Sequence, residues 1–240
     1  MREGPCAGPF FRKGNDMRGK LIVLEGIDGS GKATQAELLE RALRREGHRV
    51  MRISFPDYES DSSALVRMYL AGDFGSDPDA VNPYAASLFY AVDRFASYRM
   101  KWKRFYEAGG IVIADRYTTS NMVHQMTKIA RQEEREAFLN WLEKTEYEEL
   151  ELPRPDQVFL LDMPPEISSM LVEARAKSGG SMDIHEQHRE YLRRCHEAYQ
   201  LLAARYGWIR VACTENEGLR ERDSIAAELL RKADRPVENS

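Results

Sequence analysis

The residues best suited to chemistry in the N-terminal part of the chain are Gly26-Ile27-Asp28-Gly29-Ser30-Gly31-Lys32-Ala33. This run fits the pattern G-x-x-x-x-G-K, with alanine where the pattern asks for serine or threonine. Glycines let backbone N–H groups turn inward around a polyphosphate, the following helix start adds about half a positive charge, and Lys32 reaches the outer phosphates. A plain turn between a strand and a helix needs neither the lysine nor three glycines. The run therefore predicts a site for a nucleoside triphosphate.

Ala33 leaves open how a metal ion is held. The missing hydroxyl normally binds magnesium, and Thr34 lies about 100° further round the helix, so it cannot simply replace that hydroxyl. Water, carboxylates or the phosphates themselves would then hold the metal. The available carboxylates are Asp28, inside the loop, and Asp115, at the end of an apolar run. For Asp115 the alternative is a helix cap or a partner for Arg116.

Three further motifs are F-P-D-Y at residues 55–58, F-Y-A-V-D-R at 89–94 and D-R-Y-T-T-S-N at 115–121. The sequence contains no N-K-x-D tetrapeptide, which a signalling GTPase would use for guanine, and this argues against that class. In order and spacing, these motifs and G-I-D-G-S-G-K closely resemble those of thymidylate kinases. The resemblance runs from about residue 19 to about residue 230.

The resemblance implies a reaction and a donor site. Thymidylate kinases move the γ-phosphoryl group of ATP to dTMP, giving dTDP, with magnesium as the expected metal and a homodimer as the usual assembly. Phosphoryl transfer needs cations that converge between the two substrates' phosphates. Catalysis is therefore assigned to Lys32, Arg116, Asp115 and Asp28. ATP binding is assigned to Gly26, Ile27, Asp28, Gly29, Ser30, Gly31, Lys32, Ala33, Thr34 and Arg175. Arg175 is included by elimination, as the cation that the lid would supply, and Lys177 is the alternative.

The resemblance also outlines an acceptor pocket. Arg94 matches an arginine that reads the thymine edge, where its planar donors suit a carbonyl oxygen, and Tyr90, about one turn earlier, can stack on the base. Asn121 and Gln125 share one helical face and match positions that line the base pocket. The dTMP-binding set expected is Asp28, Phe55, Pro56, Tyr58, Tyr90, Arg94, Arg116, Asn121, His124, Gln125 and Glu186.

Some of these assignments have alternatives. Without the resemblance Tyr90 would be taken as core, and Phe55 suits the core as well as a pocket wall. His124 takes a place where relatives often carry a tyrosine beneath the deoxyribose, which leaves selectivity against ribose open. Glu186, in D-I-H-E at residues 183–186, resembles an acidic residue near the lid. It joins Asp28 and Asp115 in the predicted metal-binding set, directly or through water.

Short apolar runs alternate with longer helical patterns and must position these residues. We expect strands at residues 20–25, 49–54, 111–115, 157–162 and 208–212. We expect helices at residues 32–46, 62–71, 83–108, 118–128, 133–147, 165–176, 185–206 and 219–232. This alternation predicts an α/β fold of three layers, a P-loop nucleotide-binding fold with a five-stranded parallel sheet and a short lid at about residues 175–186.

Composition bounds the remaining possibilities. At roughly 150 residues per domain, 240 residues predict one large domain, which we place at residues 19–240. Residues 1–18 carry glycine, proline and charge without a helical or alternating period, so we expect a loose extension there. A net charge of -4 argues against nucleic acid as the main partner, and no apolar run approaches the roughly 20 residues of a membrane span. The 3 cysteines are odd in number and widely spaced, which favours a reducing cytoplasm.

Two other functions compete with thymidylate phosphorylation. The first is another P-loop kinase, acting on deoxynucleosides or nucleoside monophosphates, which would share the donor site and differ in the acceptor pocket. The second is a non-catalytic nucleotide-binding regulator, suggested by Ala33 and by the histidines His124 and His185. A panel of acceptors distinguishes the three.

Overall fold

The computed structural model describes residues 18–177, 185, 188–216 and 218–233. The predicted N-terminal extension, apart from Arg18, lies outside the described residues. Of the predicted lid, residues 175–177 and His185 are described, whereas Glu186 is outside.

Five strands form one parallel sheet, as the sequence predicts. They are β1 (Lys20–Glu25), β2 (Val50–Ser54), β3 (Ile111–Asp115), β4 (Gln157–Asp162) and β5 (Ile209–Ala212), in the order β2-β3-β1-β4-β5. The central strand β1 is almost entirely buried, which explains why it reads as an unbroken apolar run rather than an alternating one. Leu24 of β1 pairs with Asp115 of β3. The two motifs that follow these strands therefore start side by side.

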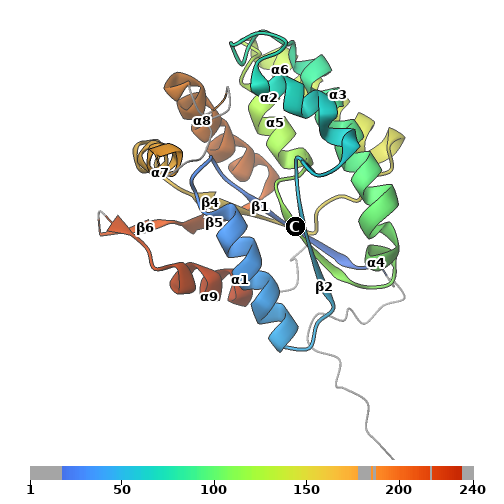
Figure 1. Cartoon of the computed structure of the whole chain (residues 1–240), viewed down its shortest axis with the longest axis vertical. Coiled ribbons are helices and arrows are strands. Elements are labelled where there is room, and N and C mark those ends of the chain that lie inside the picture. Colours follow the sequence, from blue (N-terminus) through green and yellow to red (C-terminus); the bar gives the residue numbers. More distant parts are fainter. Residues whose placement is uncertain (1–17, 178–184, 186–187, 217, 234–240) are drawn as a thin grey trace, which may run out of the picture.

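Helices cover both faces of the sheet (Figure 1). On one face α1 (Lys32–Arg45) packs on α9 (Arg222–Ala233). On the other, α5 (Thr118–Met126) contacts α3 (Pro83–Ser97), α6 (Gln132–Glu143) and α8 (Arg189–Tyr206). The remaining helical segments are η1 (Asp61–Ser63), α2 (Ala64–Ala71), η2 (Tyr98–Trp102), α4 (Lys103–Glu107), η3 (Lys144–Glu149) and α7 (Pro165–Lys177). Among the described residues no helix is long and apolar enough to span a membrane.

The helix predicted at residues 83–108 is continuous but not regular. Its central segment η2 is a π-helical turn between α3 and α4. Tyr98, Trp102 and Tyr106 are buried at intervals of four residues and pack ring against ring, Trp102 lying 4.6 Å from Tyr98 and 6.0 Å from Tyr106 between centroids. A similar π-helical turn, η3, follows α6.

Two helices begin later in the chain than predicted. The helix predicted at residues 185–206 begins at Arg189, and His185 lies in a turn, where its ring is buried and its Nε2 is 3.1 Å from Tyr69 Oη. The helix predicted at residues 219–232 begins at Arg222, because Leu219 instead pairs with Thr214 in an unpredicted hairpin, β6 (Thr214–Glu215) with β7 (Gly218–Leu219). In both cases a residue that fits the spacing of the predicted helix makes a different contact: His185 with Tyr69, and Leu219 with Thr214.

Candidate active site

The loop between β1 and α1 has the geometry of a phosphate cradle. Gly29 and Gly31 have φ values of 79° and 85°, a left-handed conformation that favours glycine, and Gly31 leads directly into α1. Lys32 is buried, and its Nζ donates to the backbone oxygens of Gly26 and Ile27, each at 2.9 Å. Burial, followed by the charge of Arg116, lowers the pKa of Lys32. Its ammonium group thus lies inside the curve of the loop.

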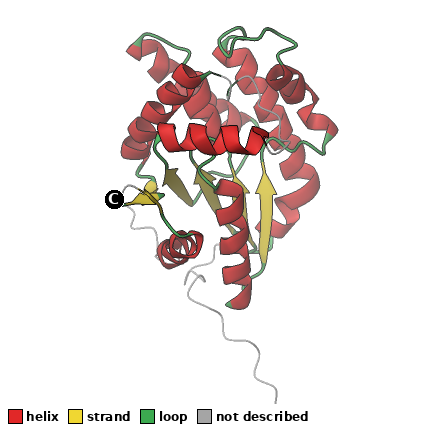
Figure 2. Ribbon diagram, turned by 60° about the vertical axis from the view of Figure 1, so that its left-hand side comes forward, coloured by secondary structure: helices red, strands yellow, loops and turns green. Residues whose placement is uncertain are grey.

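Helix α7 lies across this loop. Ser168 Oγ donates to the backbone oxygen of Asp28, and a Cβ atom added to Gly29 would lie 3.0 Å from the Ser168 backbone oxygen. In Figure 2, α7 runs across the arrowhead ends of the strands, where the loop emerges. This close approach and the left-handed backbone both favour glycine at position 29.

Arg116, directly after β3, links the phosphate loop to the neighbouring pocket. Its backbone N–H donates to Leu24 O at 3.1 Å, and its φ of 68° is unusual for a residue with a side chain. Its Nη2 donates to the carboxylate of Asp28, which also lies 3.9 Å from Lys32 Nζ. Burial alone would raise the pKa of Asp28, but the charges of Arg116 and Lys32 hold it well below its ordinary value. Asp28 is therefore ionised, and it lies between two cations.

The other terminal nitrogen of Arg116 faces α5 and α8. Its Nη1 donates to Ser120 Oγ at 3.1 Å and to Tyr199 Oη at 3.2 Å, and it lies 3.3 Å from His124 Nε2. A single guanidinium group therefore contacts both the loop that carries Lys32 and the wall of the next pocket.

Glu25 supports this arrangement and was missed in the sequence. It is fully buried and accepts hydrogen bonds from Thr119 Oγ1 at 2.6 Å, Ser120 Oγ at 2.7 Å and Tyr199 Oη at 2.9 Å, as well as from Tyr117 N at 3.3 Å. Ser120 and Tyr199 are two of the groups that hold Arg116. The available signal was a carboxylate that ends an otherwise apolar strand.

A pocket adjoins Arg116 and the loop residue Asp28. Its lining contains every described member of the predicted acceptor set, together with four residues that were not predicted, Leu70, Tyr117, Ser120 and His185. The predicted members are Asp28, Phe55, Pro56, Tyr58, Tyr90, Arg94, Arg116, Asn121, His124 and Gln125. A larger cavity of about 750 Å³ lies around the amino ends of β4 and β5, near Gln157 and Ile209, and no residue of the phosphate loop lines it.

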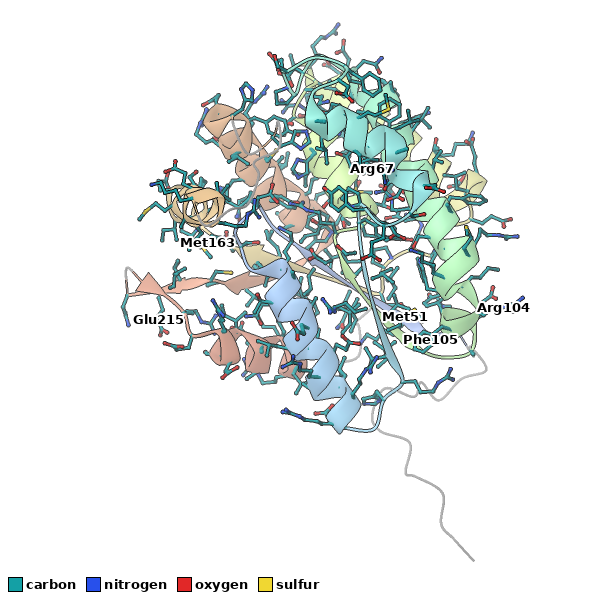
Figure 3. The ribbon with its side chains drawn as sticks, viewed as in Figure 1. Met51, Arg67, Arg104, Phe105, Met163 and Glu215 are labelled. Carbon is teal, nitrogen blue, oxygen red and sulfur yellow. The ribbon has the colours of Figure 1, made fainter. Side chains whose placement is uncertain are left out.

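The segment after β2 forms one wall of this pocket. Phe55 is buried, and Tyr58, at the rim, is 54% exposed. Asp93 fixes the segment from α3, accepting from Asp57 N at 2.8 Å and from Ser62 Oγ at 2.7 Å. Arg67 of α2, labelled in Figure 3, donates to the backbone oxygen of Tyr58 at 3.1 Å. The aspartate of F-Y-A-V-D-R thus shapes the pocket, a role that the sequence did not suggest.

The inner end of the pocket is polar and closely packed. Arg94 is 1% exposed, and its guanidinium pairs with Glu146, another buried carboxylate that the sequence did not single out. Within the described part of the chain, both side-chain polar atoms of Gln125 are buried without a hydrogen-bond partner, as is Oδ1 of Asn121. The pocket therefore offers polar atoms for a ligand to satisfy.

Two histidines form the remaining side. The rings of His124 and His185 stack at 5.4 Å between centroids and 21° between planes, and His124 Nδ1 lies 3.1 Å from Tyr191 Oη. Burial, followed by the charge of Arg116, holds the pKa of His124 well below its ordinary value. Burial lowers the pKa of His185 to about 3. Both rings are neutral at physiological pH.

The other predicted site residues lie nearby or at the surface. Asp115 is half-buried at the end of β3, and among the described residues its carboxylate makes no hydrogen bond or ion pair; Arg116 pairs with Asp28 instead. Ala33 is exposed and Thr34 half-buried in the first turn of α1. Arg175 is exposed in the last turn of α7, outside the acceptor pocket.

The fold and the paired sites define a P-loop kinase, with a phosphate-binding loop joined through one arginine to a second pocket. The model of the thymidylate kinase family matches residues 24–223. The thymidylate kinase of Mycobacterium tuberculosis is 32% identical over 193 residues, covering 78% of this chain and 87% of the relative. A probable thymidylate kinase of Pyrococcus horikoshii is 31% identical over 195 residues, covering 81% and 88%. The chain belongs to the thymidylate kinase family.

A solved structure agrees with the fold. The thymidylate kinase of Candida albicans superposes with a TM-score of 0.65 over 93% of this chain and 96% of that one, at 21% identity. The predicted fold class and family are therefore both confirmed.

Replacing Glu25 by glutamine should slow turnover. Glutamine keeps the shape of the side chain, but one of the two acceptor oxygens becomes an amino group, which is a donor. Four donors converge on this position, so Ser120 and Tyr199 lose the acceptor that orients them toward Arg116. We expect kcat to fall about tenfold or more, with the KM for ATP nearly unchanged. The matched control is Glu37→Gln on α1, where the carboxylate only pairs with Arg41 near the surface. A lower melting temperature with unchanged kcat would show that Glu25 only stabilises the fold.

The neutral state of His124 predicts a loss of stability in mild acid. The folded protein keeps this ring neutral, whereas the unfolded chain protonates it below about pH 6.5. Its contribution to the free energy of unfolding is complete above that pH and decreases as the pH falls, by up to about 1.4 kcal/mol per pH unit. Urea denaturation from pH 7.5 to 5 should give a shallower decrease for His124→Phe than for wild type. Parallel curves would contradict the assignment.

Proposed function

We propose that this chain transfers the γ-phosphoryl group of ATP to dTMP, giving ADP and dTDP. The observation that carries the proposal is the position of Arg116, whose Nη2 binds Asp28 of the phosphate loop while its Nη1 binds residues of the acceptor pocket. A transferred phosphoryl group must pass between two bound nucleotides, and a cation at their junction stabilises the charge that develops there.

Each substrate has a proposed set of residues. The loop from Gly26 to Thr34 would surround the triphosphate of ATP, with Lys32 on its outer phosphates and Arg175 supplying a further cation from α7. Phe55, Pro56 and Tyr58 would cover dTMP, Tyr90 would stack on its base, and Arg94, Asn121 and Gln125 would read the base edge. His124 would lie beneath the sugar.

The acceptor needs no strong general base. Its phosphate oxygens are largely ionised near neutral pH, so a carboxylate such as Asp115 would act through orientation and charge rather than by removing a proton. Lys32 and Arg116 would draw the two phosphate groups together in spite of their like charges. The chain thus supplies mainly position and electrostatics, which is what phosphoryl transfer requires.

The described residues contain no group of three or more potential metal ligands, so a magnesium ion would be held largely by the substrate phosphates and water. Magnesium prefers oxygen ligands and is usually held by one or two carboxylates, together with substrate phosphates and water. The Asp115 carboxylate, without a hydrogen-bond partner among the described residues, and Asp28 would help to hold it, with Glu186 as a third contributor that lies outside those residues. When bound, magnesium would neutralise charge on the phosphate oxygens.

The acceptor panel tests this proposal. ADP release from magnesium-ATP should be fastest with dTMP, compared with dUMP, UMP, dCMP, AMP, GMP and thymidine, and Lys32→Ala should serve as the blank. Arg116→Ala should lower kcat by about 10² or more, because it removes the cation between the phosphates. Preference for another acceptor would keep the phosphate chemistry and reject the base pocket. Nucleotide binding without transfer to any acceptor would favour a regulator.

We also propose that the protein forms a homodimer through α2 and α3. Leu65 and Met68 of α2, and Leu88, Val92 and Phe95 of α3, are between 37% and 52% exposed. Those of α3 share one helical face, and α2 packs on α3, so the five side chains belong to neighbouring helices. Exposed apolar side chains on neighbouring helices are typical of a contact between proteins, and closed dimers of identical chains are the commonest assembly.

Disrupting this surface should give a monomer. Wild type should have about twice the chain mass of 27.6 kDa by light scattering, and Val92→Glu should shift it to the single mass because it buries a charge in the contact. Met170→Glu on α7, where the side chain is 70% exposed, is the matched control. A dimer that survives Val92→Glu would place the contact elsewhere.

The cytoplasm is the expected compartment, since Cys195 and Cys213 are both buried free thiols.

A further inference from the structure

Behind the inner wall of the acceptor pocket lies Glu146, a carboxylate with no exposed surface. Its Oε2 accepts from Arg94 Nε at 2.6 Å and from Thr118 Oγ1 at 2.8 Å. Its Oε1 accepts from Arg94 Nη2 at 2.5 Å and from Asn121 Nδ2 at 3.1 Å. Glu146 itself does not line the pocket, whereas Arg94 and Asn121 do. Both of these residues donate to its Oε1.

These bonds fix the orientation of the Asn121 amide. Its Nδ2 donates both to Glu146 and to the backbone oxygen of Ser87, at 3.1 Å in each case. If the amide were reversed, its own oxygen would face two acceptors and no donor. Oδ1 is therefore held in one place, buried and without a partner among the described residues. It can accept a hydrogen bond from a ligand and cannot donate one.

The same carboxylate fixes Arg94. Two of its three guanidinium nitrogens, Nε and Nη2, are bound to Glu146. In the described part of the chain no hydrogen bond is made by the third, Nη1, which has only donors to offer. Arg94 and Asn121 both line the pocket, so its inner wall contains a donor from Arg94 and an acceptor from Asn121, both held by the same carboxylate.

This pattern matches one class of pyrimidine. Thymine and uracil have a carbonyl oxygen next to a ring N–H, which complements a donor beside an acceptor. Cytosine has an amino group next to an unprotonated ring nitrogen, so both contacts would be mismatched. A buried site built for one hydrogen-bond pattern rejects the reverse strongly, because mismatched polar groups are left unpaired.

We propose that Glu146 is a positioning residue for base selection: it orients Arg94 and Asn121 together so that the pocket accepts pyrimidines with an imide edge and rejects cytosine. This deepens the proposed function and rests on it, since it assumes a pyrimidine monophosphate in this pocket. Its location supports the role, because η3 is a π-helical turn, and such turns are rare and occur frequently at functional sites.

The test compares kcat/KM for dTMP, dUMP and dCMP in wild type, Glu146→Gln and Thr118→Val. In Glu146→Gln an amino group replaces one acceptor oxygen, so the Asn121 amide and Arg94 lose their fixed orientation. The KM for dTMP should rise about tenfold or more, and the preference for dTMP over dCMP should fall by at least a similar factor. The KM for ATP and the preference for dTMP over dUMP, which depends only on a methyl group, should stay the same.

Thr118→Val is the matched control. It removes one hydrogen bond to Glu146 but keeps the bonds to Arg94 and Asn121, so stability should fall while base preference is retained. Unchanged preference for dTMP over dCMP in Glu146→Gln would overturn the inference. If this variant does not fold, wild type is tested instead with dTMP methylated at N3, which cannot donate from that nitrogen. The inference requires kcat/KM for this analogue to be at least about tenfold lower than for dTMP, and equal kcat/KM for the two overturns it. Absence of any dTMP turnover by wild type would instead refute the proposed function.

Discussion

The contact between Arg116 and Asp28 is the interaction on which the rest of the site depends. It joins the loop after β1 to the motif after β3, two segments that parallel pairing brings to the same edge of the sheet. Around it lie a second cation, Lys32, and a second carboxylate, Glu25. Each charge is costly to bury alone, and the cost is offset only when the four are held together with good geometry. The pairing of β1 with β3 therefore brings the charged residues together, and their contacts in turn hold the two segments that follow these strands.

The two carboxylates set the positions of the two cations. Asp28 binds Arg116 directly. Glu25 does not touch Arg116 but binds Ser120 and Tyr199, which in turn accept hydrogen bonds from Arg116. Arg116 also holds its position through its backbone, with its amide bound to β1 and a left-handed φ. Such a conformation costs on the order of 1–3 kcal/mol and persists only where the surroundings enforce it. The backbone of the protein itself thus helps to set the position of the guanidinium group.

The sequence predicts the parts of this site that depend on local pattern. The glycine run specifies the loop and the apolar strands specify the sheet. In the structure, Asp28, Arg116 and the described acceptor residues line one pocket. Local pattern marks Glu25 only as a carboxylate at the end of β1 and does not mark Glu146, because the roles of both come from partners 25 to 174 positions away along the chain. The start of α8 was misjudged for a related reason: the burial of His185 comes from Tyr69 and His124, not from helical phase.

The π-helical turn at Tyr98–Trp102 lets one helix serve two surfaces. Buried side chains at Arg94, Tyr98, Trp102 and Tyr106 recur every four residues, whereas an ideal α-helix advances about 100° per residue, so each interval would rotate the next side chain by about 40°. Over three intervals the drift would reach about 120°, enough to move Tyr106 off the face that Arg94 occupies. The wider turn absorbs this rotation. Packing of these aromatic residues in the hydrophobic core thereby helps to set the rotation of α3 about its axis, and with it the direction from which Arg94 enters the pocket.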